Sequence, residues 1–74
     1  MKKETVNSEI IFIVEEAPEG GYSARAAGES IFTQADTLDV LRTNIREAVT
    51  AHFEENRRPK LIRLHHIKDE IIPV

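Results

Sequence analysis

The sequence predicts an α+β fold with the element order β-β-β-α-β, in which one helix packs on one face of an antiparallel sheet of three to four strands. Three observations predict it: a β-branched and aromatic run at residues 10–14, turn residues at 15–21, and one amphipathic pattern at 37–55. A chain of 74 residues has room for one domain. We therefore expect a single domain over residues 1–74, with residues 1–8 as a flexible or edge segment.

The first strand is predicted at residues 10–14, where five apolar residues in a row are too few for a typical helix. Alternation along a strand places Ile11 and Ile13 on the opposite face from Ile10, Phe12 and Val14. A strand that is apolar on both faces needs two covers, and the helix supplies only one. We expect a homo-oligomer, either a dimer or a tetramer, with Ile11 and Ile13 in its interface.

Two more strands are predicted after a hairpin loop. Hairpin loops use residues with a restricted φ, here Pro18, and residues that allow a positive φ, here Gly20 and Gly21. The return strand covers residues 22–27, with Tyr22, Ala24 and Ala26 on one face, where the alanines would let a helix approach closely. Residues 28–29 form a second turn, and a short strand follows at 30–33.

The helix is predicted over residues 37–55, with Asp36 or Thr37 as its N-terminal cap. Its apolar arc recurs at three- and four-residue spacing and comprises Leu38, Leu41, Ile45, Ala48, Val49, His52 and Phe53. Asn56 is a plausible stop, and Pro59 prevents continuation. The last strand is predicted at residues 60–67.

The charge is distributed unevenly between the two halves of the sequence. Residues 1–40 carry eight acidic and three basic side chains, whereas residues 41–74 carry five and seven, for a net charge of −3. A nucleic-acid-binding protein is more often basic overall, and an acidic half suits a basic protein partner better. The longest apolar run has five residues, far short of the roughly 20 of a membrane-spanning helix. We expect a cytoplasmic protein with no membrane contact.

Three histidines are the candidates for chemistry. His65 and His66 with Asp69 and Glu70 could suggest a metal site, but adjacent side chains of a strand point to opposite faces, so strand-surface roles are favoured. His52 lies on the apolar arc and is interpreted as a hydrogen-bonded core histidine rather than a catalytic base. We predict no catalytic, metal or cofactor residue, and no enzyme. The alternative is a small hydrolase or nuclease that uses these histidines.

A basic cluster follows the predicted helix. It comprises Arg57, Arg58, Lys60 and Arg63. The favoured interpretation is a solvated helix end and strand face, and the alternative is an anion or nucleic-acid contact.

Between residues 19 and 49, a set of motifs runs from a Gly-Gly-Tyr turn through a strand of small residues to a capped helix. Its positions are Gly21, Tyr22, Ala24, Thr33, Asp36, Thr37, Leu38, Asn44 and Ala48. As an ordered set, these motifs resemble the HicB-like antitoxin family, over about residues 9–55. Two features depart from the family's pattern: residues 26–30 replace its proline-rich loop, and Ala35 stands where a glycine is usual.

The resemblance implies a partial ribonuclease-H-like fold without catalytic acids. It also implies a non-enzymatic protein-binding module that sequesters a small, basic, RNA-cleaving HicA-like toxin. The expected contact residues are Glu15, Glu16, Glu19, Tyr22 and Arg25. Many family members continue into a DNA-binding domain; we predict only the N-terminal module here and no direct nucleic-acid binding.

Overall fold

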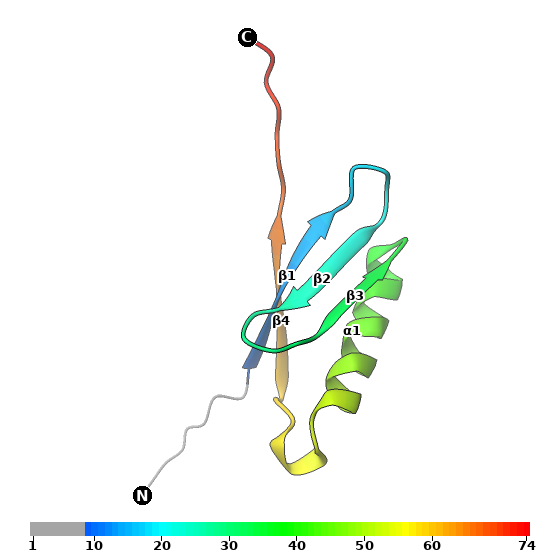
Figure 1. Ribbon diagram of the computed structural model, residues 1–74, viewed down its shortest axis with the longest axis vertical. Helices are drawn as coiled ribbons and strands as arrows, with labels where there is room; N and C mark the ends of the chain where they lie inside the picture. The colour runs from blue at the N-terminus through cyan, green and yellow to red at the C-terminus, as the bar shows by residue number, and fades with distance from the viewer. Residues whose placement is uncertain (1–8) are drawn as a thin grey trace, which may run out of the picture.

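The fold is seen in a computed structural model, which describes residues 9–74 (Figure 1). The predicted segment 1–8 lies outside the described residues. The elements are β1 (Glu9–Glu16), β2 (Tyr22–Ala26), β3 (Phe32–Ala35), α1 (Leu38–His52), a short 3-10 helix η1 (Glu55–Arg57) and β4 (Leu61–Ile67). The α+β class and the β-β-β-α-β order are confirmed.

The four strands form one sheet in the order β3-β2-β1-β4, with α1 against one face. β2 pairs antiparallel with both β1 and β3, and Val14 lies opposite Ala24. β4 instead runs parallel to β1, with Phe12 opposite Leu64, so the sheet is mixed and not wholly antiparallel. The reason is the helix: a strand that returns after a helical crossover runs in the same direction as the strand before it, and β3 already runs parallel to β1.

The core lies between α1 and the face of the sheet that carries alternate strand residues. Phe12 and Leu41 are completely buried, and Ala24 is buried where the helix passes over β2. Among residues 9–74, the buried residues are Ile10, Phe12, Val14, Ala24, Ala26, Ile31, Leu41, Ile45 and Val49. The predicted helix arc therefore faces the core except at His52, and the small residues of β2 lie beneath the helix as expected.

The opposite face of the sheet, here called the outer face, has no helix over it in the described part of the chain. The strand register places Phe32, Arg25, Ile13 and His65 in one row across β3, β2, β1 and β4. The outer face thus alternates apolar and polar residues.

The ends of α1 follow local chemistry. Thr37 is the cap, because its side chain accepts a hydrogen bond from the backbone N–H of Val40 at 3.2 Å. The helix ends at His52, three residues earlier than predicted, because Phe53 has extended backbone angles. No helix in residues 9–74 has the length and apolar content to cross a bilayer.

Replacing Thr37 with alanine should lower the free energy of unfolding by about 1 kcal/mol, because a backbone N–H of the first turn loses its acceptor. Urea denaturation followed by circular dichroism measures the change. Thr50→Ala, at an exposed helix position, is the matched control and should change stability by less than about 0.5 kcal/mol. Equal losses in the two variants would contradict the capping role.

Candidate functional site

Acidic side chains gather where the β1–β2 hairpin loop meets the start of α1. This region, here called the acidic end, comprises Glu15, Glu16, Glu19, Asp36 and Asp39. Among the described residues, the carboxylates of Glu16, Glu19 and Asp36 form no hydrogen bond or ion pair, whereas Asp39 accepts a hydrogen bond from Arg42 at 2.9 Å. The acidic end therefore offers carboxylates that no cation within residues 9–74 neutralises.

The hairpin loop has a defined shape. The backbone N–H of Ala17 donates to Gly21 O at 2.9 Å, and that of Gly20 donates to Ala17 O at 3.0 Å. Gly21 has φ +86°, and a Cβ built there would lie 3.1 Å from the Ala35 carbonyl oxygen. Glycine at this position lets the loop approach the end of β3, which brings Glu19 toward Asp36.

The five residues expected to contact a partner fall on two sides of the sheet. Tyr22 lies on the helix side, partly buried, in a groove that Glu19, Asp36, Val40 and Asn44 also line. Arg25 lies on the outer face, where its Nη2 is 4.0 Å from Glu15 Oε2.

The groove adds three residues that the prediction of partner contacts omitted: Asp36, Val40 and Asn44. Val40 is 49% exposed. In the sequence, Val40 is an apolar residue outside the predicted apolar arc of the helix. That feature could have identified it as an exposed contact residue.

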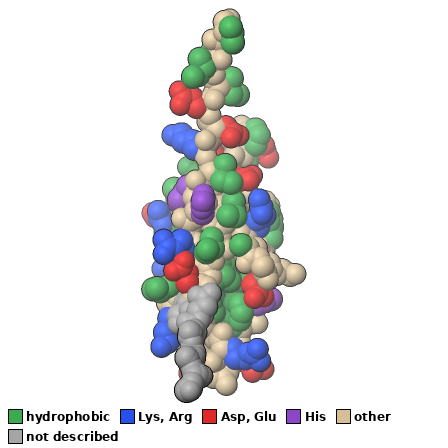
Figure 2. Space-filling view, turned by 90° about the vertical axis from the view of Figure 1, so that its left-hand side faces the viewer, with side chains coloured by type: hydrophobic (Ala, Val, Ile, Leu, Met, Phe, Trp, Pro, Cys, Tyr) green, Lys and Arg blue, Asp and Glu red, His purple; other side chains and the backbone are tan. Residues whose placement is uncertain are grey.

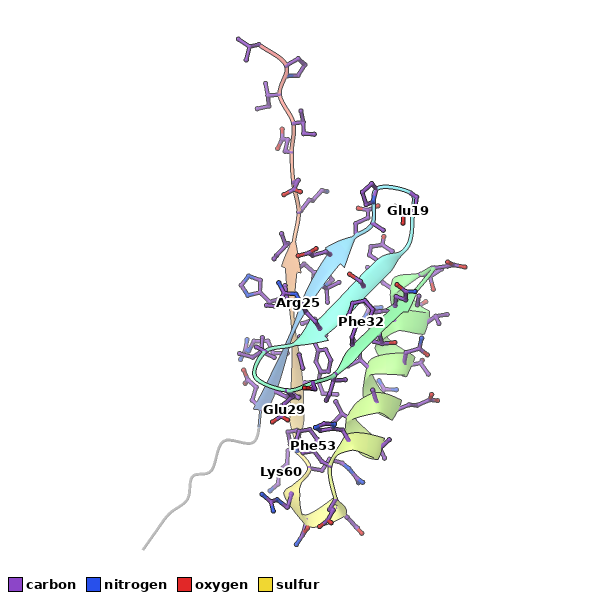
Figure 3. The ribbon with its side chains drawn as sticks, viewed as in Figure 1. Glu19, Arg25, Glu29, Phe32, Phe53 and Lys60 are labelled. Carbon is purple, nitrogen blue, oxygen red and sulfur yellow. The ribbon has the colours of Figure 1, made fainter. Side chains whose placement is uncertain are left out.

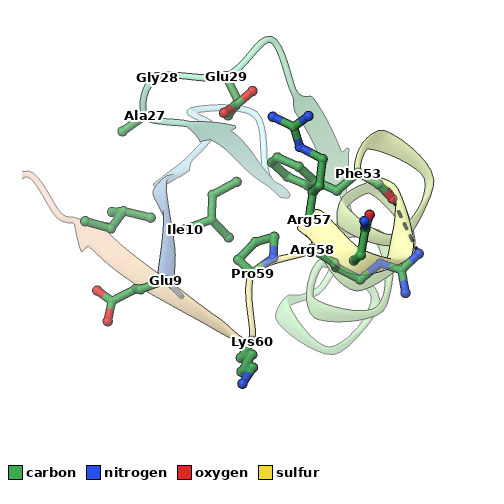
Figure 4. Close-up of a pocket in the computed structure, with 12 residues that line it drawn as sticks. Glu9, Ile10, Ala27, Gly28, Glu29, Phe53, Arg57, Arg58, Pro59 and Lys60 are labelled. Carbon is green, nitrogen blue, oxygen red and sulfur yellow. Dashed lines mark hydrogen bonds between the residues drawn. The ribbon is translucent and has the colours of Figure 1, made fainter. Parts of the chain in front are cut away.

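The four residues of the basic cluster do not form one surface. Arg58 Nη2 donates to the carbonyl oxygens of Thr50 at 3.1 Å and Phe53 at 3.4 Å, so this side chain caps the end of α1. Arg63 lies on the outer face and pairs with Glu9. Arg57 and Lys60 remain, on the rim of an open pocket of about 850 Å³ (Figure 4).

That pocket lies at the opposite end of the molecule from the hairpin loop. Figure 3 shows Lys60 and Phe53 near the end of α1 and Glu19 at the far end of the sheet. Glu29 also lines the pocket, so its lining is of mixed charge. Such a lining is a poorer fit to a phosphate backbone than a continuous basic stripe.

The Glu9–Arg63 pair joins β1 to β4 by two hydrogen bonds, of which Nη2–Oε1 measures 3.1 Å. Hydrogen bonding from Arg63, with its positive charge, holds the pKa of Glu9 below its ordinary value of 4.5. A carboxylate with a lowered pKa in the folded state adds stability above pH 4.5, and this contribution is lost as the pH falls through the lower, folded-state pKa.

We therefore expect Glu9→Gln to unfold at lower urea concentration than the wild type at pH 7, and the difference to shrink as the pH drops below 4.5. Urea midpoints measured between pH 7 and pH 3 test this. Glu47→Gln, on the exposed side of α1, should show no such pH-dependent difference. A difference between Glu9→Gln and wild type that stays constant down to pH 3 would refute the linkage.

The three histidines do not form one site. The expectation of a buried His52 is wrong: its side chain is 36% exposed, and Nε2 lies 3.2 Å from Glu29 Oε1. His52 is the last residue of α1, and Val49 and Phe53 on either side of it pack into or against the core in its place. His65 lies on the outer face and His66 on the helix side of β4, both exposed. Residues 9–74 contain no group of three His, Asp or Glu placed to hold one metal ion.

Comparison with known proteins identifies the family of this chain. A UPF0150 protein of Archaeoglobus fulgidus is 56% identical over 52 residues, which are 70% of this chain and 77% of that protein. A UPF0150 protein of Thermotoga maritima is 42% identical over 66 residues, 89% of this chain and 93% of that protein. The chain belongs to the UPF0150 family. No family model matches the sequence, and no solved structure matches it either.

This UPF0150 protein also carries exposed apolar side chains on its outer face. Ile11 is 36% exposed and Ile13 partly buried, while Phe32, Leu61 and Ile67 are exposed by 63%, 62% and 41%. Figure 2 views the molecule from the side of β4, and hydrophobic and charged side chains are interspersed there. Ile11 and Ile13 thus lie on an uncovered face, and their role in an oligomer stays a prediction.

Proposed function

We propose that this UPF0150 protein is a cytoplasmic, non-enzymatic binding module that sequesters a small, basic, RNA-cleaving toxin of the HicA kind. The observation that supports this most is the acidic end, where Glu16, Glu19 and Asp36 have no cationic partner within the described residues. A basic protein that binds RNA would find on this surface a substitute for the phosphates of its substrate.

The groove beside these carboxylates supplies the other part of a protein interface. Tyr22 presents an aromatic ring and a hydroxyl, and Val40 presents an exposed apolar side chain in the first turn of α1. Interfaces commonly combine a small aromatic or aliphatic anchor with a charged rim. In this arrangement the carboxylates would attract and orient the toxin, and Tyr22 and Val40 would be buried on contact.

The test is affinity purification of the tagged full chain from its native cell, with mass spectrometry of what binds. We expect one small basic protein in about equal amount with the wild type, and its loss with Glu16→Gln/Glu19→Gln. Glu54→Gln/Glu55→Gln is the matched control, because it removes the same charge near η1, at the other end of the molecule. This control should retain the partner.

The recovered protein, purified alone, should cleave RNA, and adding the wild-type chain should stop the cleavage. Absence of any small basic partner in the wild-type sample would refute the proposal. So would a partner whose RNA cleavage the wild-type chain leaves unchanged.

A further inference from the structure

The outer face of the sheet carries apolar side chains that no element within residues 9–74 covers (Figure 1). Ile11 and Ile13 lie in the middle of β1, an interior strand of the sheet. Leu61 and Ile67 lie on the same face of the neighbouring strand β4 and are 62% and 41% exposed. A strand that is apolar on both faces normally has both faces covered, and contiguous exposed apolar side chains indicate a contact surface.

The charged side chains of the outer face neutralise one another. They are two acids and two bases: Glu9 pairs with Arg63, and Glu15 pairs with Arg25. Glu9 is at the start of β1 and Glu15 is near its end, so the two isoleucines of β1 lie between the ion pairs. Protein interfaces commonly have an apolar centre and a polar rim. The outer face has this arrangement, and a contact at its centre would leave both ion pairs intact.

A second copy of the chain fits this face because the face has no excess of either charge. A two-fold contact uses the same surface on both partners, so any net charge of that surface meets itself and repels. The acidic end would repel its own copy, since three of its carboxylates have no cationic partner within residues 9–74. The outer face carries two charges of each sign and can therefore meet an identical face.

We propose that two copies pack their outer faces together, sheet on sheet, about a two-fold axis that crosses β1 between Ile11 and Ile13. The axis lies between the two sheets and runs across the strands. Each β1 then lies over the β1 of the other copy and runs in the opposite direction, so Ile11 of each copy contacts Ile13 of the second copy. Packed sheets are about 10 Å apart, a separation that facing side chains of this size fill.

The same axis brings the apolar residues of β4 together. It keeps each strand over its own copy and reverses the strand direction. Leu61, at the start of β4, therefore comes over the second copy's Ile67, at its end. At the rim, Glu9 comes over the second copy's Glu15, and each carboxylate keeps the arginine that neutralises it. The exposed apolar side chains of β4 are thus covered, and the charged side chains stay at the edge of the contact.

Sedimentation velocity of the full chain at micromolar concentration tests the assembly. We expect a dimer for the wild type. Ile13→Glu should weaken the dimer by roughly a hundredfold, because two-fold symmetry places two carboxylates in one apolar contact. Ile72→Glu is the matched control, since it makes the same substitution at a position that is 74% exposed and lies after β4, outside the sheet. This control should leave the dimer unchanged.

Opposite charges test which residues meet. Ile11→Lys alone should also weaken the dimer. Ile11→Lys/Ile13→Glu should recover about tenfold in affinity over either single variant, because each lysine then faces a glutamate of the second copy. If the axis ran along β1 instead, each residue would face its own copy, like charges would meet, and the double variant would be the weakest of the three.

Circular dichroism at a concentration below the dissociation constant of each dimer should give the same spectrum for all variants, because the altered side chains lie on the face away from the core. A recovery in the double variant also excludes misfolding of the single variants as the cause of their weaker association.

A monomeric wild type would overturn the proposal, and so would a dimer that survives Ile13→Glu or one that dissociates with Ile72→Glu. A double variant weaker than both single variants would overturn the contact between Ile11 and Ile13. None of these substitutions changes the acidic end, so the outcome is independent of the proposed toxin binding.

Discussion

Replacing Phe12 with alanine is expected to cost about 3–5 kcal/mol of folding free energy, or to prevent folding altogether. Phe12 is completely buried and lies in the middle of the central strand β1, between Ala26 of β2 and Leu64 of β4. Its neighbours on β2 are small, so they cannot close over the space that the ring would leave. A domain of this length has a thin core and a stability at the low end of about 5–15 kcal/mol, so the loss would be a large part of the total.

Phe32→Ala is the matched control, since it deletes the same atoms from a ring that is 63% exposed on β3. Urea denaturation of both variants at one protein concentration should show a loss for Phe32→Ala several times smaller than for Phe12→Ala. Comparable losses would mean that the outer face is as well packed as the core. That result would contradict the exposure of Phe32 in the single chain.

Local patterns predicted the elements well because their causes are local. The β-branched and aromatic run at residues 10–14 gave β1, and the spacing of Leu41, Ile45 and Val49 gave the buried side of α1. Thr37 caps the helix through its own side chain, an interaction that spans three residues. Each of these features depends on neighbours in sequence, and a single sequence contains that information.

The features that the sequence did not predict depend on contacts between distant residues. Parallel pairing of β4 with β1 joins residues about fifty positions apart, and the pattern of either strand alone is compatible with both directions. Arg63 does not join a basic surface because it bonds to Glu9 of the neighbouring strand β1, and Arg58 does not because it bonds to the end of α1. A group of like charges in sequence is therefore a weak predictor of a charged surface.

His52 shows the limit of periodicity at the end of a helix. Its spacing from Val49 and Ala48 is that of a core residue, but its side chain is 36% exposed and bonds to Glu29, while Val49 is buried. The acidic end shows the opposite case. Glu19 and Asp36 are separated in sequence, and they line one groove because Gly21 lets the hairpin loop lie against Ala35 and Asp36.

Reversing charge at the acidic end should weaken binding of the proposed toxin by about a hundredfold. Glu16→Arg/Glu19→Arg removes two attractive interactions, each worth up to about 1 kcal/mol at an exposed site, and adds repulsion in their place. Because these side chains are exposed, most of the loss should be in the association rate. Surface plasmon resonance with the purified partner, at low and high salt, measures both rates.

Glu54→Arg/Glu55→Arg makes the same change of charge at the opposite end of the molecule and should change affinity by less than about threefold. High salt should reduce the wild-type association rate and bring it toward that of the reversed variant, because screening at 1 M acts over about 3 Å. Equal losses in both variants would indicate attraction to the net charge of the protein alone. An unchanged association rate in the hairpin variant would remove the acidic end from the mechanism, and Tyr22 and Val40 would then be the side chains to test for contact.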